Sequence, residues 1–194
     1  MTSGSDPPLM VDSNLLIYSV LDDHPASPVC RAYITRQGKI TLTILTPIEI
    51  YFVLIRIYSI AEEQASDTIE RLMRTPIELV SADESDVTAT LRLCASHHLD
   101  TNDALQLHLC RQLGIHRLAT DDGHLTNVAL AYGLTVENPI DETLRQQMAT
   151  WEAAHLPAKG LPRLLGHVYG WLSEREPLLA DEFRNATGNL HRLP

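Results

Sequence analysis

Acidic side chains stand at four places in the sequence where a short apolar run gives way to a polar turn or a helix start. They are Asp12, Glu49, Asp103 and the pair Asp121 and Asp122. Carboxylates that are brought together without a neighbouring lysine or arginine repel one another, and a bound cation removes that repulsion. Hard oxygen ligands favour Mg²⁺ or Mn²⁺ over Zn²⁺. Such a site can activate water and hold a phosphodiester, so the acids point to phosphodiester hydrolysis.

Each acid also has a purely structural interpretation, because Asp and Glu are common in the first turn of a helix. Asp12 can cap the helix that follows it. The segment Thr46-Pro47-Ile48-Glu49 has the pattern of a capping box with proline at the first helical position. Asp103 suits a helix N-terminus, and Asp121-Asp122-Gly123 can be a turn. The metal-site hypothesis therefore depends on the joint placement of the acids.

The elements expected around the acids alternate between short strands and longer helices, which predicts an α/β protein with a mostly parallel sheet. Strands are expected at 9–11, 39–45, 77–80, 116–119 and 134–137. Helices are expected at 13–21, 28–37, 47–60, 62–74, 84–97, 102–113 and 125–132. Because ligands bind beyond the carboxyl ends of parallel strands, the four acidic positions should meet at one edge of the sheet.

The segments that carry the acids resemble, in order and spacing, the PIN domain family and within it the VapC-like toxins of toxin–antitoxin pairs. They are Val-Asp-Ser-Asn, Pro-Ile-Glu-Ile-Tyr, Asn-Asp-Ala-Leu-Gln-Leu and Leu-Ala-Thr-Asp-Asp-Gly-His-Leu, and the resemblance covers residues 9–140. It implies a three-layer α/β/α fold and an endoribonuclease that cleaves RNA with Mg²⁺ or Mn²⁺. It also implies a homodimer that an antitoxin protein inhibits.

Carried over by position, the resemblance assigns the family's catalytic acids to Asp12, Glu49, Asp103 and Asp122. The first, third and fourth of these are expected to ligate the metal. Glu49 is expected to ligate the metal or to position the attacking water.

Three further polar positions are expected to support the acids. Asn14 and Thr120 match residues that orient metal ligands through hydrogen bonds, and Asp121 is placed with them. Family members often carry another acid two residues beyond Asp122, where this sequence has His124. That difference counts against a second metal site, and His124 is expected to lie at the surface.

The overall charge argues against general nucleic-acid binding. The formal net charge is −10, and residues 1–140 contain 18 acidic residues against 9 Lys or Arg. Affinity for a phosphate backbone comes largely from basic side chains. Bound divalent cations, or a basic patch supplied by dimerisation or by locally placed arginines, would reconcile RNA cleavage with this composition.

Composition and hydrophobic pattern divide the chain into three parts: a flexible leader at 1–8, the PIN-like domain at 9–140 and a helical extension at 141–194. In the extension, Asp141 is expected to cap one helix, Pro157 and Pro162 to break it, and Pro177 to begin another. We expect the extension to pack on the sheet domain or on another subunit. No apolar stretch is long enough to span a membrane, and three scattered cysteines suit a reducing cytosol, so a cytoplasmic protein is expected.

Two other functions fit parts of the pattern. A PIN-like module that has lost catalysis and serves in binding or assembly is favoured by the acidic composition, His124 and the long extension, whereas retention of all four acids counts against it. A phosphotransfer domain of the haloacid-dehalogenase or receiver type also places acids at strand ends. Those chemistries need Asp-x-Asp-x-Thr or a suitably placed lysine, and the only lysines are Lys39 and Lys159.

Overall fold

A five-stranded parallel sheet forms the centre of the computed structural model, which describes residues 7–156 and 161–188. Its strand order is β3-β2-β1-β4-β5, with β1 at Leu9–Val11, β2 at Ile40–Thr43, β3 at Ile77–Val80, β4 at Arg117–Ala119 and β5 at Thr135–Glu137. The chain winds outward from β1 to β3 and then returns to the other side of β1. The neighbouring strands β1 and β4 therefore flank the point where the winding reverses, and ligands bind beyond the strand ends at such points.

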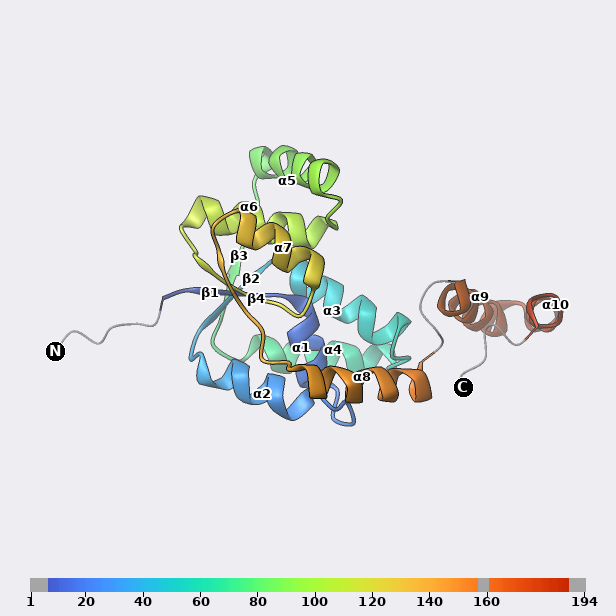
Figure 1. Ribbon diagram of the computed structural model, residues 1–194. Coiled ribbons are helices and arrows are strands. Elements are labelled where there is room, and N and C mark those ends of the chain that lie inside the picture. Colours follow the sequence, from blue (N-terminus) through green and yellow to red (C-terminus); the bar gives the residue numbers. More distant parts are fainter. Residues whose placement is uncertain (1–6, 157–160, 189–194) are drawn as a thin grey trace.

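Helices cover both faces of the sheet, so the expected α/β/α architecture is confirmed (Figure 1). On one face lie α1 (Ser13–Val20), α2 (Ser27–Arg36), α3 (Leu45–Arg56), α4 (Glu62–Met73) and α8 (Glu142–His155). On the other lie α5 (Glu84–His97), α6 (Thr101–Leu113) and α7 (Gly123–Ala131). The sheet thus holds two helical layers apart and leaves its carboxyl edge between them.

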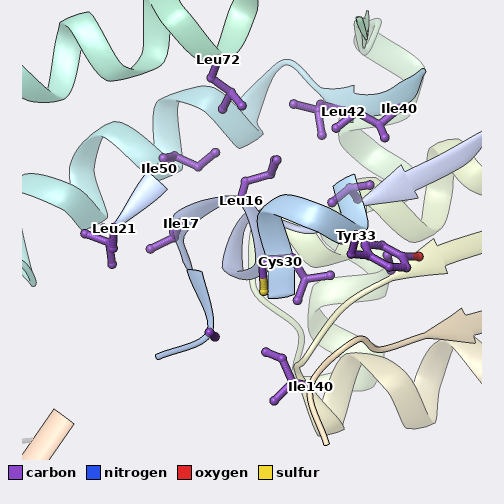
Figure 2. Close-up of a cluster of buried hydrophobic side chains, with 14 of the residues drawn as sticks. Leu16, Ile17, Leu21, Cys30, Tyr33, Ile40, Leu42, Ile50, Leu72 and Ile140 are labelled. Carbon is purple, nitrogen blue, oxygen red and sulfur yellow. The ribbon is translucent and has the colours of Figure 1, made fainter. Parts of the chain in front are cut away.

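The hydrophobic core is divided by the sheet into two clusters. Leu9 and Val11 of β1 point into the cluster with α1, α2 and α3, part of which Figure 2 shows around Leu16 and Ile50. Met10 points into the other cluster, with α6 and α7. Successive strand residues face opposite sides, so a strand that is covered on both faces must be apolar throughout. This burial fixes the end of β1, directly before the first acid.

The helix that follows β2 begins differently from the sequence expectation. The capping box predicted for Thr46-Pro47-Ile48-Glu49 does not form, and α3 already begins at Leu45 without a side-chain cap at its N-cap position. Instead the Thr43 hydroxyl, at the end of β2, accepts hydrogen bonds from the backbone N–H groups of Leu45 (3.2 Å) and Thr46 (3.3 Å). The capping prediction was wrong because a buried strand residue takes over this local role. The Glu49 carboxylate is left for another partner.

Most other bounds agree with the expected ones or shift by a few residues. The expected strands at 9–11 and 77–80 and the helix at 84–97 have the predicted ends. The strand expected at 39–45 is shorter, because the chain turns into α3 after Thr43. The helix expected to reach residue 60 ends at Arg56, ahead of Ser59, which has a positive φ of 54°. A left-handed residue of this kind ends helical geometry.

The helices after residue 141 form two groups. Helix α8 is capped by Asp141, whose side chain accepts from Leu144 N, and it buries Met148 in the core. Helices α9 (Leu161–Arg175) and α10 (Pro177–Thr187) pack on each other and lie apart from the sheet in Figure 1. Pro162 was expected to break a helix. It stands instead in the first turn of α9, where proline is tolerated.

Two expectations concern residues that the structure does not describe. Pro157 and residues 1–6 of the expected leader lie outside the described residues. Within the described ranges, none of the helices has the length and apolar character that crossing a membrane requires.

Candidate functional site

Asp12 lies directly after β1 and is almost fully buried, with 3% of its surface exposed. Its Oδ1 accepts hydrogen bonds from Ser13 N (2.6 Å) and Gln106 Nε2 (3.2 Å), and its Oδ2 accepts from Thr120 Oγ1 (2.7 Å). Burial raises the pKa of Asp12, and these three hydrogen bonds oppose the rise. The residue therefore caps α1 and also belongs to a polar network that reaches α6 and β4.

Thr120, directly after β4, is the centre of that network. Its hydroxyl donates to Asp12 and accepts from Asn14 Nδ2 (3.2 Å) and from the backbone N–H of Asp122 (2.9 Å). Asn14 Oδ1 in turn accepts from the backbone N–H of Asp121 (3.3 Å). Because β1 and β4 are neighbours, two of the three residues expected as supports, Asn14 and Thr120, lie together and join the first acid to the last.

Glu49 lies in α3, beyond the first turn of that helix, and Asn102 of α6 holds its carboxylate. The Asn102 side-chain amide donates to Glu49 Oε2, and its oxygen accepts from Thr43 Oγ1 at 2.6 Å. Partial burial raises the pKa of Glu49, the charges of Asp12 and Asp100 add to the rise, and the hydrogen bond from Asn102 lowers it. The carboxylate that the sequence assigned to a capping box thus points to the same polar cluster as Asp12.

Asp103 lies in the first turn of α6, whose N-cap Asp100 accepts the backbone N–H of Asp103 at 2.8 Å. Partial burial and surrounding negative charge raise the pKa of Asp103 to about 8, and the charges come from Asp12, Asp100, Asp122 and Glu49. In the described ranges, no hydrogen bond reaches the Asp103 carboxylate. Without a cation, this carboxyl group is therefore largely protonated near neutral pH.

The adjacent residues Asp121 and Asp122 point to different partners. Asp122 Oδ1 accepts from Leu125 N at 2.7 Å and caps α7, which begins at Gly123. The Asp121 side chain instead pairs with Arg145 of α8. Of the two, Asp122 adds its charge to the environment of Asp103, whereas Asp121 contributes to the network through its backbone N–H.

The donor chemistry of the four acids fits a hard divalent cation. They offer carboxylate oxygens only, and like charges add to the effect of burial in raising the pKa of Asp103. Within residues 7–156 and 161–188, however, no three His, Cys, Asp or Glu side chains are arranged so that they could hold a metal ion. A cation shared by Asp12, Asp103 and Asp122 would therefore draw their side chains closer together.

Sequence reasoning did not single out Gln106, Asn102 or Thr43, although all three are buried in the polar network. Asn102 and Gln106 are four residues apart and thus on one face of α6, among the buried apolar residues of that helix. That spacing was a usable signal. Thr43 left none, because threonine is an ordinary strand residue. His124 is exposed, as expected, and its Nε2 lies 2.7 Å from His97 O.

The fold and the acids together define an α/β protein with a carboxylate cluster at the reversal point of its sheet. Residues 9–131, more than half of the chain, match the family model of the PIN domain. The chain therefore belongs to the PIN domain family. Among curated proteins, none matches it.

Two solved structures share the fold. The first is VapC20 of Mycobacterium tuberculosis, described as a sarcin–ricin-loop-cleaving toxin, with a TM-score of 0.55 and 14% identity over 66% of this chain and 96% of that one. The second is VapBC2 of Rickettsia felis bound to a DNA fragment from its promoter, with a TM-score of 0.50 and 13% identity over 68% and 98%. At these identities the likeness concerns the fold alone.

Proposed function

We propose that this protein is an endoribonuclease that hydrolyses RNA phosphodiester bonds with Mg²⁺ or Mn²⁺ held by Asp12, Asp103 and Asp122. The observation that carries the proposal is the meeting of four acids at the carboxyl edge of the sheet. Thr120 joins Asp12 to Asp122 there, and burial and the neighbouring like charges raise the pKa of Asp103. Such an arrangement stabilises neither the apo fold nor the ionised acids, and it becomes favourable when a cation binds. Membership of the PIN domain family supports the same chemistry.

The chain's own residues have separate roles in this proposal. A divalent cation, when bound, supplies the positive charge that favours ionised acids and a polarised phosphate. Asp12 is kept in one orientation by Thr120 and Gln106. Glu49, held by Asn102, orients the attacking water and accepts its proton, and its raised pKa suits a group that exchanges protons.

We further propose that the protein acts in the cytoplasm as the toxin of a toxin–antitoxin pair, as a homodimer with an antitoxin protein as partner. The support is the PIN fold together with the likeness to VapC20 and VapBC2. A small reading frame next to the gene that encodes an antitoxin-like protein would favour this role. A gene without such a neighbour would favour a nuclease of another kind.

The experiment is cleavage of a mixed RNA pool by purified protein with Mg²⁺ or Mn²⁺, with EDTA as one control and Asp12→Asn as the test variant. Asp83→Asn is the matched control, because Asp83 also caps a helix but is exposed and lies outside the acid cluster. Cleavage that EDTA and Asp12→Asn abolish and Asp83→Asn leaves intact supports the proposal. Calorimetry of Mn²⁺ binding accompanies the assay.

A catalytically silent binding or assembly module is the second candidate. One observation favours it, because the acids in the described part of the chain are not placed to share a metal ion. If the protein neither cleaves RNA with either metal nor binds Mn²⁺, we would assign it as a catalytically silent binding or assembly module. Mn²⁺ binding without cleavage would instead direct the search to the RNA substrate or to an inhibiting partner.

A further inference from the structure

An ion pair joins helix α8 to the segment 120–122 of the carboxylate cluster. Arg145 Nη2 lies 2.8 Å from Asp121 Oδ1, and Asn138 Nδ2 donates to the same oxygen at 2.9 Å. The Asp121 side chain is only 8% exposed, whereas that of Arg145 is 44% exposed. A buried carboxylate is costly unless it is paired, so the ion pair with Arg145 keeps Asp121 in this place.

Asp121 stands between the two residues that connect the acids. Thr120 on one side donates to Asp12, and Asp122 on the other side caps α7. The backbone N–H of Asp121 also donates to Asn14. A shift of Asp121 therefore displaces three hydrogen bonds that orient the acids, even though its own carboxylate faces α8.

The position of Arg145 is set by the packing of α8 on the core. Met148 is buried in the core, and Leu144 packs against the same cluster. Further along, the Trp151 ring meets the His24 ring edge-on, with 4.9 Å between centroids. Arg145 thus projects from a firmly packed helix and not from a free chain end. Helix α8 lies beyond residue 131, where the match to the PIN domain ends.

We propose that Arg145 is a positioning residue for the carboxylate cluster, acting through Asp121 on the segment 120–122. The proposal rests on the proposed function for its effect on catalysis. Arg145 touches neither the four proposed catalytic acids nor a substrate in this proposal, and its other ion pair is with the exposed Glu142 of its own helix, at 3.8 Å. It holds the segment that carries Thr120 and Asp122, and the C-terminal extension thereby contributes to the site.

The test compares Arg145→Gln with Arg145→Lys. Gln removes the charge at similar size, whereas Lys keeps it. For Arg145→Gln we expect kcat for RNA cleavage and Mn²⁺ affinity to fall about tenfold each, the lower end of what losing an outer support of a metal site costs. We expect KM to stay within about twofold, because substrate contacts are untouched. Arg145→Lys should recover most of both losses.

A second readout is amide hydrogen exchange, which locates the change in the chain. Exchange in Arg145→Gln should become faster in residues 120–126 and stay unchanged in α2 and α4. The control is Arg74→Gln, because Arg74, the C-cap residue of α4, forms an ion pair with Glu70 of that helix, away from the acids. We expect this control to match the wild type in kcat, Mn²⁺ affinity and exchange.

The double variant Asp121→Asn with Arg145→Gln separates charge compensation from general packing. A neutral amide at position 121 needs no cation, so the double variant should be closer to the wild type than Arg145→Gln alone. The proposal is overturned if Arg145→Gln behaves like Arg74→Gln, or if exchange accelerates over the whole chain together with a lower melting temperature.

Failure of the proposed function has a different signature. Wild-type protein that cleaves no RNA would contradict the nuclease assignment. The exchange in residues 120–126 of Arg145→Gln would still decide whether Arg145 positions this segment.

Discussion

Two acids of the same cluster, at the start of α1 and at the start of α6, are held in opposite ways. Asp12 receives hydrogen bonds from a backbone N–H, a glutamine and a threonine. Asp103 lies among like charges, and the raised pKa of about 8 follows from its burial and from those charges. Neutral donors thus orient Asp12 in the absence of a metal. The ionised Asp103 carboxylate is instead repelled by the neighbouring acids, and a bound cation would offset that repulsion.

This difference suggests a division of labour within the site. Residues around Asp12 fix geometry, because each of its oxygens is already directed by a donor. Asp103 sets the dependence on a cation, because its ionised form is disfavoured until positive charge arrives. The two halves should therefore respond differently to mutation and to pH.

The largest expected effect is that of Asp103→Asn. Activity should fall by about a hundredfold or more, because loss of a metal ligand removes several kcal/mol of charge stabilisation. The metal-free protein should nevertheless become more stable, by about 2–4 °C in melting temperature, which corresponds to ~1 kcal/mol in a domain of this size. RNA cleavage and metal-free thermal unfolding measure the two effects. A variant that loses both activity and stability would contradict the division of labour.

Next in size is the effect of Thr120→Val, which tests the Asp12 half. The substitution keeps the shape of the side chain but removes the donor to Asp12 and the acceptor of two hydrogen bonds. We expect an activity loss of about tenfold and a destabilisation of about 1–3 kcal/mol, because buried polar groups lose their partner. Denaturant unfolding and cleavage rates give the values. Thr35→Val, at an exposed helical threonine, is the matched control.

A smaller effect is expected in the pH dependence of stability. The pKa of Asp103 is higher in the folded protein than its ordinary value of 3.8, so the folded state binds this proton more tightly. The resulting stabilisation is complete below pH 3.8 and is lost as the pH rises through about 8. The metal-free wild type should therefore gain stability relative to Asp103→Asn as the pH falls from 9 to 6. Melting temperatures measured between pH 9 and pH 6 check this prediction. A difference between the two proteins that stays constant over this pH range would refute the assignment.

The smallest effect is expected for His124→Ala. His124 is exposed and contacts the backbone oxygen of His97, outside both halves of the acid cluster. Activity should remain within about twofold, and stability within about 0.5 kcal/mol, as for most surface substitutions. Cleavage assays with Mg²⁺ and Mn²⁺ check the first value. A large loss of activity would bring His124 into the site, at the position where related sequences often carry an acid.

Local sequence patterns predicted the frame of the site well. The expected bounds are found for the strands at 9–11 and 77–80 and for the helix at 84–97. Burial on both faces accounts for the first strand and a capping box for the start of the helix, since both act over a few residues. Placement of Asp12, Asp103 and Asp122 at caps or in a first helical turn also followed from local signals, whereas Glu49 lies beyond the first turn of α3. The same reasoning failed at 46–49, where a capping pattern competed with the Thr43 hydroxyl at the end of β2.

Pairings between distant segments were beyond local reasoning. Gln106 reaches Asp12, Asn102 reaches Glu49, and Arg145 reaches Asp121 across 24 positions. Each partner is an ordinary polar residue in its own segment, and its role exists only where the fold brings the segments together.

The sequence by itself determined the α/β frame and the place of Asp12, Asp103 and Asp122 at helix starts, since periodicity and capping are local properties. Only the tertiary structure decided which oxygens receive hydrogen bonds, why Asp103 and not Asp12 lacks such donors, and that Asp121 turns to α8. The physical reason is that hydrogen bonds and charge interactions act over a few ångströms in space. The strand order β3-β2-β1-β4-β5 sets those separations, whatever the distance along the chain.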